Sequence, residues 1–405
     1  MIKVLWIIPK WTLPAIDGAR VATERLLTNV TGSAVSVDVL CFANSDEVID
    51  PRVMHSSWNV RNIFSLKRSV ATAGRSKIFY FLFKLLTRPF TPLTFSSFDT
   101  IDNKNFISRK LEGDQYDFIL LDGLHLAACL HRDHNGFLTG DSKVIYRAHN
   151  IESDLWLKSA EDTSNPLKKI IFKFQYSLVK KFEEFVLEKS YGVAPISVED
   201  EATIEKSVKV KNMHLTPLGL NFDQVLDKCE DEKLQLLFLG KLDWAPNKEG
   251  LKWILDDVWP SVIKNRDDIV LNIVGSGNKQ WLEKYKNLKG VKLHGFVKDI
   301  KDAYKACHYT IAPITFGSGT RIKVLESYAF GRKIISTRMG VQGAGMVEKD
   351  YIHCESTQDW IETLSNLKVD QEFEISAIDT NSRLSENFGD KKVGSDFQLW
   401  LESLR

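Results

Sequence analysis

The sequence of 405 residues has no apolar run long enough to cross a membrane. Residues 1–9 are largely apolar, but Pro9 ends this run well short of the roughly 20 residues that a transmembrane helix needs. The segment also lacks a charged leader and a small-residue cleavage site, so we predict a buried first strand and no signal peptide. Charged residues interrupt the longest apolar stretches elsewhere, and no transmembrane helix is expected.

Cysteine is scarce, and neither sign of charge is in excess. None of the five cysteines belongs to a Cys-x-x-Cys pair, which argues against a structural metal and a disulfide framework. The pattern favours buried, reduced thiols in a cytosolic protein. The net charge is +1, from 54 basic and 53 acidic residues, so no global field indicates nucleic acid as a partner. The cysteines are Cys41, Cys129, Cys229, Cys307 and Cys354.

The most informative pattern in the chain is in residues 309–331. Residues 309–313 are apolar and predict a strand, and the Gly-Ser-Gly of residues 317–319 is typical of a loop. From Thr320 onward, apolar residues recur at helical spacing until Gly331, which we expect to end the helix. In this layout, backbone N–H groups and a helix N-terminus face an anion.

Two cations stand at the start of this predicted helix. Arg321 and Lys323 oppose the helix dipole there, at a cost of roughly 0.3–1 kcal/mol. A phosphate ligand would offset that cost, and Glu326, one turn later, suits paired sugar hydroxyls. The alternative is an ordinary surface loop whose charges are solvated.

Several segments of the second half together resemble the donor site of the retaining glycosyltransferases of family 4 (glycosyl transferases group 1), which have the GT-B fold. They occur in the order found in that family. One position departs from it: many members have a glutamate where this chain has Ser318, which leaves open how the donor sugar hydroxyls are held. The matching segments are residues 239–247, 274–277, 294–297, 313–331 and 333–337, with Gly340.

The resemblance implies an α/β protein of the GT-B type, with two Rossmann-like parallel-sheet domains facing across a cleft. We expect an acceptor-binding domain at residues 1–216, completed by a C-terminal helix at 386–405 that crosses back to it. The donor-binding domain is expected at residues 217–385. The implied activity is retaining transfer of a sugar from a nucleotide-diphosphate sugar to a lipid-linked oligosaccharide or surface polysaccharide precursor, at the cytoplasmic face of the cell membrane.

The resemblance also implies roles for individual residues of the donor site. Arg321, Lys323 and Lys241 would neutralise the diphosphate, together with the helix N-terminus at Gly319 and Thr320. No Asp-x-Asp occurs in the sequence, so neither a metal clamp nor a cofactor is expected. The remaining donor-site residues are Glu326 for the ribose hydroxyls, Gly275 near the nucleoside, and Phe296 and Val297 for the nucleobase.

Two positions of the first half are also site candidates. Gly18 opens a helical pattern after the first strand, and the resemblance implies that its loop approaches the donor diphosphate. His149 follows the predicted strand at residues 143–147, within a His-Asn-x-Glu pattern found in part of family 4, and would hold the donor sugar or face its anomeric carbon. The alternatives are an ordinary βα turn and a core histidine, and His125 is a rival candidate.

Residues 51–98 contain no acidic side chain and many basic and aromatic ones. This composition suits peripheral contact with an anionic membrane through residues 61–92, or with a lipid diphosphate acceptor. A helix packed on the sheet with a solvated basic face is the alternative. A second tract, residues 167–189, is helical in pattern and rich in lysine.

Two other functions remain open at this point. A GT-B-fold sugar-nucleotide epimerase would need acid and base groups at the reacting carbons, which the Arg-x-Lys-x-x-Glu pattern does not supply. A non-catalytic partner subunit that binds nucleotide sugar would be consistent with Ser318 and Ala19 at positions where the family has other residues.

Overall fold

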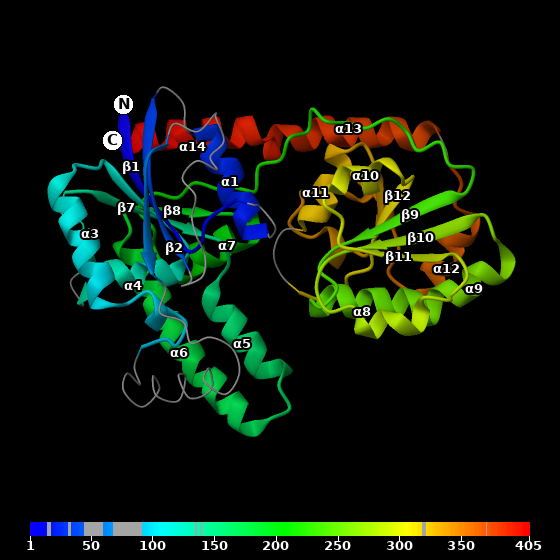
Figure 1. Ribbon diagram of the computed structural model, residues 1–405, viewed down its shortest axis with the longest axis horizontal. Helices are drawn as coiled ribbons and strands as arrows, with labels where there is room; N and C mark the ends of the chain where they lie inside the picture. The colour runs from blue at the N-terminus through cyan, green and yellow to red at the C-terminus, as the bar shows by residue number, and fades with distance from the viewer. Residues whose placement is uncertain are drawn as a thin grey trace. The chain divides into compact units, whose positions relative to one another are not determined.

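A computed structural model describes residues 1–13, 18–30, 34–43, 60–67, 91–133, 136–137, 139, 141–317, 321–369 and 371–405. The chain forms two compact units. The first comprises Met1–Gly219 with Val393–Arg405, and the second comprises Leu220–Lys392 (Figure 1). Each unit is built on its own six-stranded sheet.

The sheet of the first unit has the strand order β3-β2-β1-β4-β7-β8, and every pairing in it is parallel. Its central strands are mostly apolar, and all of their residues except Lys3 are buried, as expected for a parallel sheet covered on both faces. The strands are β1 (Ile2–Ile8), β2 (Val35–Ala43), β3 (Val60–Lys67), β4 (Phe118–Asp122), β7 (Lys143–Ala148) and β8 (Gly192–Pro195).

Helices cover both faces of this sheet, and several begin at a polar residue that caps them. Asn165 caps α6 by accepting a hydrogen bond from the Lys168 N–H, and Ser197 caps α7 in the same way from Asp200. The helices are α1 (Gly18–Val30), α3 (Ile101–Gly113), α4 (Ala127–Leu130), α5 (Glu152–Asp162), α6 (Pro166–Lys189), α7 (Val198–Ser207) and α14 (Asp390–Leu404). Shorter elements are η1 (Phe95–Ser97), η2 (Leu124–Leu126), β5 (His131–Asp133) and β6 (Gly136–Phe137).

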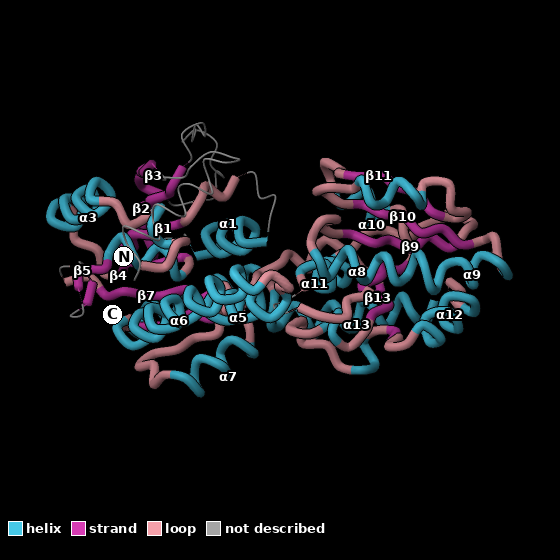
Figure 2. The backbone as a smooth tube through the Cα atoms, turned by 90° about the horizontal axis from the view of Figure 1, so that it is seen from below, coloured by secondary structure: helices cyan, strands magenta, loops and turns pink. Residues whose placement is uncertain are grey.

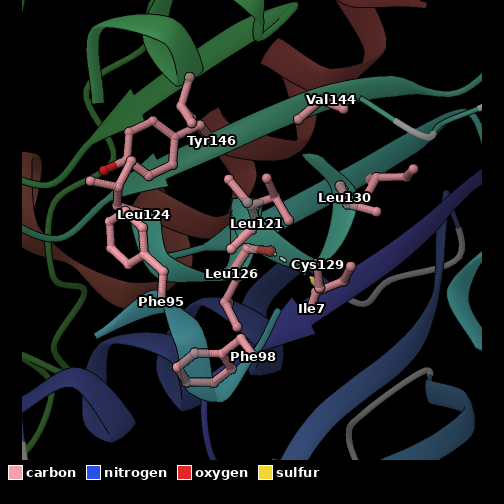
Figure 3. Close-up of a cluster of buried hydrophobic side chains, with 14 of the residues drawn as sticks. Ile7, Phe95, Phe98, Leu121, Leu124, Leu126, Cys129, Leu130, Val144 and Tyr146 are labelled. Atoms are coloured by element: carbon pink, nitrogen blue, oxygen red, sulfur yellow. Dashed lines mark hydrogen bonds between the residues drawn. The ribbon is translucent and has the colours of Figure 1, made fainter. Parts of the chain in front are cut away.

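The core of the first unit lies on both faces of its sheet. Figure 3 shows part of one side, where the aromatic rings of Phe95 and Phe98 pack near strand residues such as Leu121. On the other side, Phe397 and Leu401 of α14 are buried against the first strands. The C-terminal helix therefore returns to the N-terminal unit, as predicted.

The sheet of the second unit has the order β11-β10-β9-β12-β13-β14, again wholly parallel. Its core contains the fully buried Trp259 and Trp360. Gly250 is required by close packing, because a Cβ atom there would lie 1.9 Å from the carbonyl oxygen of Pro313. The strands are β9 (Leu234–Leu239), β10 (Ile269–Val274), β11 (Val291–Gly295), β12 (Tyr309–Ala312), β13 (Lys333–Ser336) and β14 (Ile352–His353).

Figure 2 shows the strands of this sheet in magenta, with α9 and α12 beside them. The helices are α8 (Ala245–Trp253), α9 (Trp259–Asn265), α10 (Ile300–Lys305), α11 (Ile322–Ala329), α12 (Thr357–Asn366) and α13 (Gln371–Phe388). A π-helical turn, η3 (Ile254–Val258), joins α8 to α9. Short 3₁₀ turns are η4 (Gln280–Tyr285), η5 (Met339–Val341) and η6 (Glu348–Asp350).

The predicted fold class, with two parallel-sheet domains and a returning C-terminal helix, is confirmed. β11 ends at Gly295, so the nucleobase candidates Phe296 and Val297 follow the strand and do not belong to it. Within the described ranges, no helix is long and apolar enough to cross a membrane. Residues 68–90, which make up most of the basic aromatic segment, lie outside the described residues.

Candidate functional site

The first group of candidate residues surrounds a buried carboxylate at the carboxyl end of β4. Asp122 is the last residue of that strand and is almost completely inaccessible to solvent. Its Oδ1 atom accepts hydrogen bonds from Arg147 Nη1, at 3.2 Å, and from His149 Nε2. Its Oδ2 atom accepts from Thr23 Oγ1, at 2.6 Å, and from the indole of Trp6, at 3.3 Å. Three other segments of the chain, namely β1, α1 and the end of β7, thus meet at this carboxylate.

The charges in this group balance one another. Burial by itself would raise the pKa of Asp122, but the charges of His149 and Arg147 and the hydrogen bonds to it hold that pKa well below its usual range. Burial lowers the pKa of Arg147, and the adjacent carboxylate opposes this effect. Asp122 is therefore ionised and can only accept hydrogen bonds, so Nε2 of His149 carries a proton.

The structure brings His149 and the start of α1 to the same carboxylate. α1 begins at Gly18, and Thr23, in its second turn, donates to Asp122 beside His149. His149 lies just after β7, and its side chain is 13 % exposed. The rival His125 lies in η2, where its ring packs against Phe98 with 4.8 Å between ring centroids.

A pair of glutamates, Glu152 on α5 and Glu183 on α6, lies where the segment after His149 meets α6. The buried carboxylate of Glu183, on α6, accepts from the backbone N–H groups of Glu152 and Ser153 and from the Ser153 hydroxyl, at 2.6–3.1 Å. It caps α5, whose own N-cap residue, Ile151, has no side-chain acceptor. Burial, and then the charge of Glu183, raise the pKa of Glu152 to about 7. The segment that carries His149 is thereby fixed to α6.

The second group of candidate residues lies in the second unit, around Lys323 on α11. Lys323 Nζ donates to Asn247 Oδ1, at 2.7 Å, and the Asn247 amide donates to the carbonyl oxygen of Lys241, at 3.0 Å. The same ammonium lies 4.5 Å from the centre of the Phe238 ring. Gly240 leaves room for this arrangement, because a Cβ atom there would lie 2.6 Å from the Asn247 amide nitrogen.

Burial dominates the electrostatics of this second group. Burial, and then the charge of Arg321, lower the pKa of Lys323 to about 7, and the charge of Glu326 acts in the opposite direction without restoring it. Arg321 is 5 % exposed, burial lowers its pKa, and its guanidinium lies 5.2 Å from the Trp244 ring centre. The negative charge of Glu326 therefore does not fully offset the effects of burial and of Arg321 on Lys323.

Helix α11 presents the other predicted donor residues in this group. It begins at Ile322, with Arg321 as the N-cap residue, and ends before Gly331, whose φ of +74° is left-handed, as predicted. Glu326 lies one turn after Lys323 and accepts a hydrogen bond from the Tyr304 hydroxyl at 3.3 Å. Gly319 and Thr320 lie outside the described residues.

The remaining donor candidates follow neighbouring parallel strands, so they share one edge of the sheet. Lys241 follows β9, and its exposed ammonium lies 3.7 Å from the Asp243 carboxylate. Gly275 follows β10 and has a packing role, since a Cβ atom there would lie 1.8 Å from the Gly240 carbonyl oxygen. Phe296 follows β11 and is 70 % exposed, whereas Val297 is half-buried.

Sequence analysis missed three residues that organise these groups, namely Asp122, Arg147 and Asn247. Asp122 and Arg147 lie in apolar strands, where a charged residue indicates that a hydrogen-bonding or oppositely charged partner is present. The pattern does not indicate which residue that partner is. Asn247 lies near the start of α8, and Lys323 is 76 positions further along the chain. Within the described part of the chain, no cluster of three or more histidine, cysteine or acidic residues could hold a metal ion.

Comparison with known structures identifies the fold. Anabaena HepE in complex with UDP-glucose is similar with a TM-score of 0.66 at 12 % identity, over 100 % of both chains. TarM is similar with a TM-score of 0.64 at 10 % identity, over 99 % of both chains. A glycosyltransferase of Rickettsia africae gives 0.63 at 11 % identity, over 100 % of this chain and 98 % of that one. The chain has the GT-B fold of these proteins.

Sequence comparison then gives a family match over part of the chain. Residues 233–369 match the family described as Glycosyl transferases group 1, which confirms the predicted resemblance over these residues. A Klebsiella pneumoniae protein, described as an uncharacterized 44.6 kDa protein in the cps region, is 24 % identical over 297 residues. That match covers 69 % of this chain and 73 % of the relative.

Proposed function

We propose that this protein is a retaining, metal-independent glycosyltransferase that moves a sugar from a nucleotide-diphosphate sugar to an acceptor. The observation that carries the proposal is the group around Lys323, in which the buried Arg321 and the half-buried Lys323 lie at the start of a helix and burial depresses the pKa of both. A diphosphate would supply the negative charge that this group is short of. The family of residues 233–369 supports the same reaction class.

In this proposal, protein groups neutralise the departing diphosphate. Arg321, Lys323 and Lys241 provide the positive charge, with the α11 N-terminus and its preceding Gly319 and Thr320. Preorganised donors of this kind supply a large share of catalysis, and the loss of one costs roughly 3 kcal/mol in the transition state. The sequence has no Asp-x-Asp, which supports neutralisation without a metal ion.

The other candidate residues position the donor. Glu326 would accept hydrogen bonds from the ribose hydroxyls, and Phe296 and Val297 would contact the nucleobase, with Gly275 near the nucleoside. His149, whose Nε2 proton is held by Asp122, would face the sugar with its Nδ1 edge. Gly18 would approach the diphosphate. We assign the acceptor to residues 1–216 with 386–405, and the donor to residues 217–385.

Two relatives suggest the substrate classes. HepE has been crystallised with UDP-glucose, so UDP is the first nucleotide to test. The Klebsiella relative comes from a cps region, which supports a surface polysaccharide or lipid-linked precursor as the acceptor. An acceptor of that kind would place the protein in the cytoplasm, at the inner face of the membrane, and residues 61–92 are one proposed contact. Within them, Arg61 pairs with the buried Asp38 at 2.6 Å and so has a structural role.

The experiment is a thermal-shift screen against UDP, GDP, ADP, TDP and their common sugar conjugates, first without metal and then with a chelator. One diphosphate should raise the melting temperature, because a ligand at 100 times its Kd stabilises the folded state by about 2.7 kcal/mol. The shift should survive chelation. No shift with any nucleotide would overturn the proposal, whereas binding without turnover on any acceptor would favour a non-catalytic subunit. Interconversion of the sugar nucleotide without acceptor would favour an epimerase.

A further inference from the structure

The first half of α6 exposes a continuous apolar stripe. Leu167 and Ile170 are 71 % and 66 % exposed, and Ile171 and Phe174 are 37 % and 39 % exposed. Their spacing of three, four and seven residues places all four on one side of the helix. Single exposed apolar side chains are ordinary on protein surfaces, but four in one stripe indicate an interaction surface.

This stripe is separate from the side of α6 that packs on its own unit. The packing side is formed by buried residues such as Gln175 and Val179. Gln175 Oε1 accepts the backbone N–H of Leu93, which fixes that side inward. Packing against the core of the first unit therefore does not explain why these exposed residues are apolar.

The part of α6 that carries the apolar stripe also carries lysines but no acidic residue. Residues 166–181 contain five lysines and no acidic residue, and all five lysines are exposed. Lys169, Lys173 and Lys180 are spaced by four and seven residues, so they form one row along the helix beside the stripe. The first acidic residue of α6 is Glu183, and it is buried.

The α5–α6 pair carries this surface away from the sheet. In Figure 1 the two helices lie side by side and extend beyond the strands of their own unit. Trp156 and Phe172 pack edge to face between them, with ring centroids 5.7 Å apart. The end of α5 has two exposed carboxylates, Glu161 and Asp162, so the positive surface belongs to α6 and not to the whole pair.

We infer that this face of α6 binds the surface of an anionic lipid membrane. An apolar stripe beside a row of lysines is the composition with which an interfacial helix enters the headgroup layer. Each lysine near an anionic surface adds about 1 kcal/mol of attraction, equivalent to about fivefold in affinity. The inference goes beyond the proposed transfer reaction, because membrane binding is measurable whether or not the protein transfers a sugar.

The test is co-sedimentation of the full chain with vesicles of phosphatidylcholine alone or with about a third phosphatidylglycerol. Wild-type protein should bind the anionic vesicles and lose binding as salt is raised. The variant Lys169→Gln/Lys173→Gln/Lys180→Gln should bind them on the order of 100-fold more weakly. The variant Leu167→Ser/Ile170→Ser should also lose at least about tenfold, because its apolar contacts with the bilayer are gone.

Matched controls remove the same groups from elsewhere. Lys264→Gln/Lys286→Gln/Lys289→Gln takes three exposed lysines from the second unit, and Ile101→Ser/Leu399→Ser takes two exposed apolar side chains from the first. Both should bind vesicles as the wild type does. Equal binding by the α6 variants and their controls would overturn the inference. So would loss of self-association or of a protein complex in the Leu167→Ser/Ile170→Ser variant without a change in vesicle binding.

Discussion

The two units differ in how far their buried charges are balanced by neighbouring groups. In the first, the carboxylate of Asp122 is surrounded by Arg147, His149 and Thr23, so its charge is balanced within the chain. In the second, burial lowers the pKa of Lys323 to about 7 and also that of Arg321, and the opposing effect of Glu326 is insufficient. The first arrangement is complete without a ligand, whereas an anion would complete the second.

This contrast distinguishes a group of residues that positions a side chain from a group that would bind a ligand. A buried ion pair that is satisfied in the free protein holds its neighbours in one geometry, which suits the orientation of His149. A depressed lysine pKa means that diphosphate binding would restore the lost proton. Substitutions should therefore reduce stability in the first unit and ligand affinity or turnover in the second.

The largest expected effect is that of Asp122→Asn on stability. The change leaves Arg147 buried without a charged partner, and breaking such a pair typically costs 3–5 kcal/mol. Urea unfolding should show this loss. His149→Asn is the control, because it keeps the Asp122–Arg147 pair. It should change the unfolding free energy by less than about 1 kcal/mol. An equal loss in both variants would mean that His149 is structural.

Lys323→Ala should reduce turnover by roughly 100-fold, because one preorganised diphosphate contact is lost. Its melting temperature should not fall, since a partly buried cation is removed. Lys305→Ala, which removes an exposed lysine from α10 of the same unit, is the control and should behave as wild type in both respects. Unchanged turnover of Lys323→Ala at saturating donor would remove Lys323 from the diphosphate site.

The same lysine predicts a pH dependence of stability. The pKa of Lys323 is about 7 in the folded protein and 10.5 ordinarily, so the unfolded chain holds more protons between these values. Stability must then rise with pH across that window. Unfolding free energies of wild type and Lys323→Ala at pH 7 and pH 9 should show a smaller rise in the variant. A parallel rise in both would mean that Lys323 is not the group responsible.

The sequence was sufficient to predict the fold. Apolar strands, helix caps and glycine turns are local patterns, and Gly331 ended its helix where expected. The site required contacts between distant positions. Asp122 and Thr23 are 99 residues apart, and Asn247 and Lys323 are 76 apart. No local pattern indicates which polar group a buried charge will meet.

Glu326→Gln should weaken nucleotide diphosphate binding by roughly tenfold, because hydrogen bonds to an ionised acceptor are worth more than those to an amide. Isothermal titration with the nucleotide that gives the thermal shift would measure this. Glu362→Gln, an exposed change on α12, is the control. Unaltered affinity of Glu326→Gln would leave its contact with the Tyr304 hydroxyl as the role of Glu326.

The smallest expected effect tests whether buried charge in the first unit is also balanced away from Asp122. Glu152 lies beside Glu183, and the pKa of both carboxyl groups is raised. Further negative charge comes from Asp154, which acts on Glu183, and from Asp200, which acts on the Tyr146 hydroxyl.

The pKa of Glu152 is about 7, against an ordinary 4.5, so the folded state holds more protons between these values. Wild-type stability should therefore fall as pH rises from 4.5 to 7 and stay lower above it. Glu152→Gln removes one of the two charges and should flatten this dependence, raising the melting temperature at pH 8 by a few degrees, whereas exposed Glu161→Gln should not. If the variant also keeps full turnover at both pH values, the glutamate pair only supports the fold. If turnover falls while the melting temperature rises, the proton on Glu152 beside Glu183 positions the segment that carries His149. The geometry of the first unit would then depend on more than the balanced charge of Asp122.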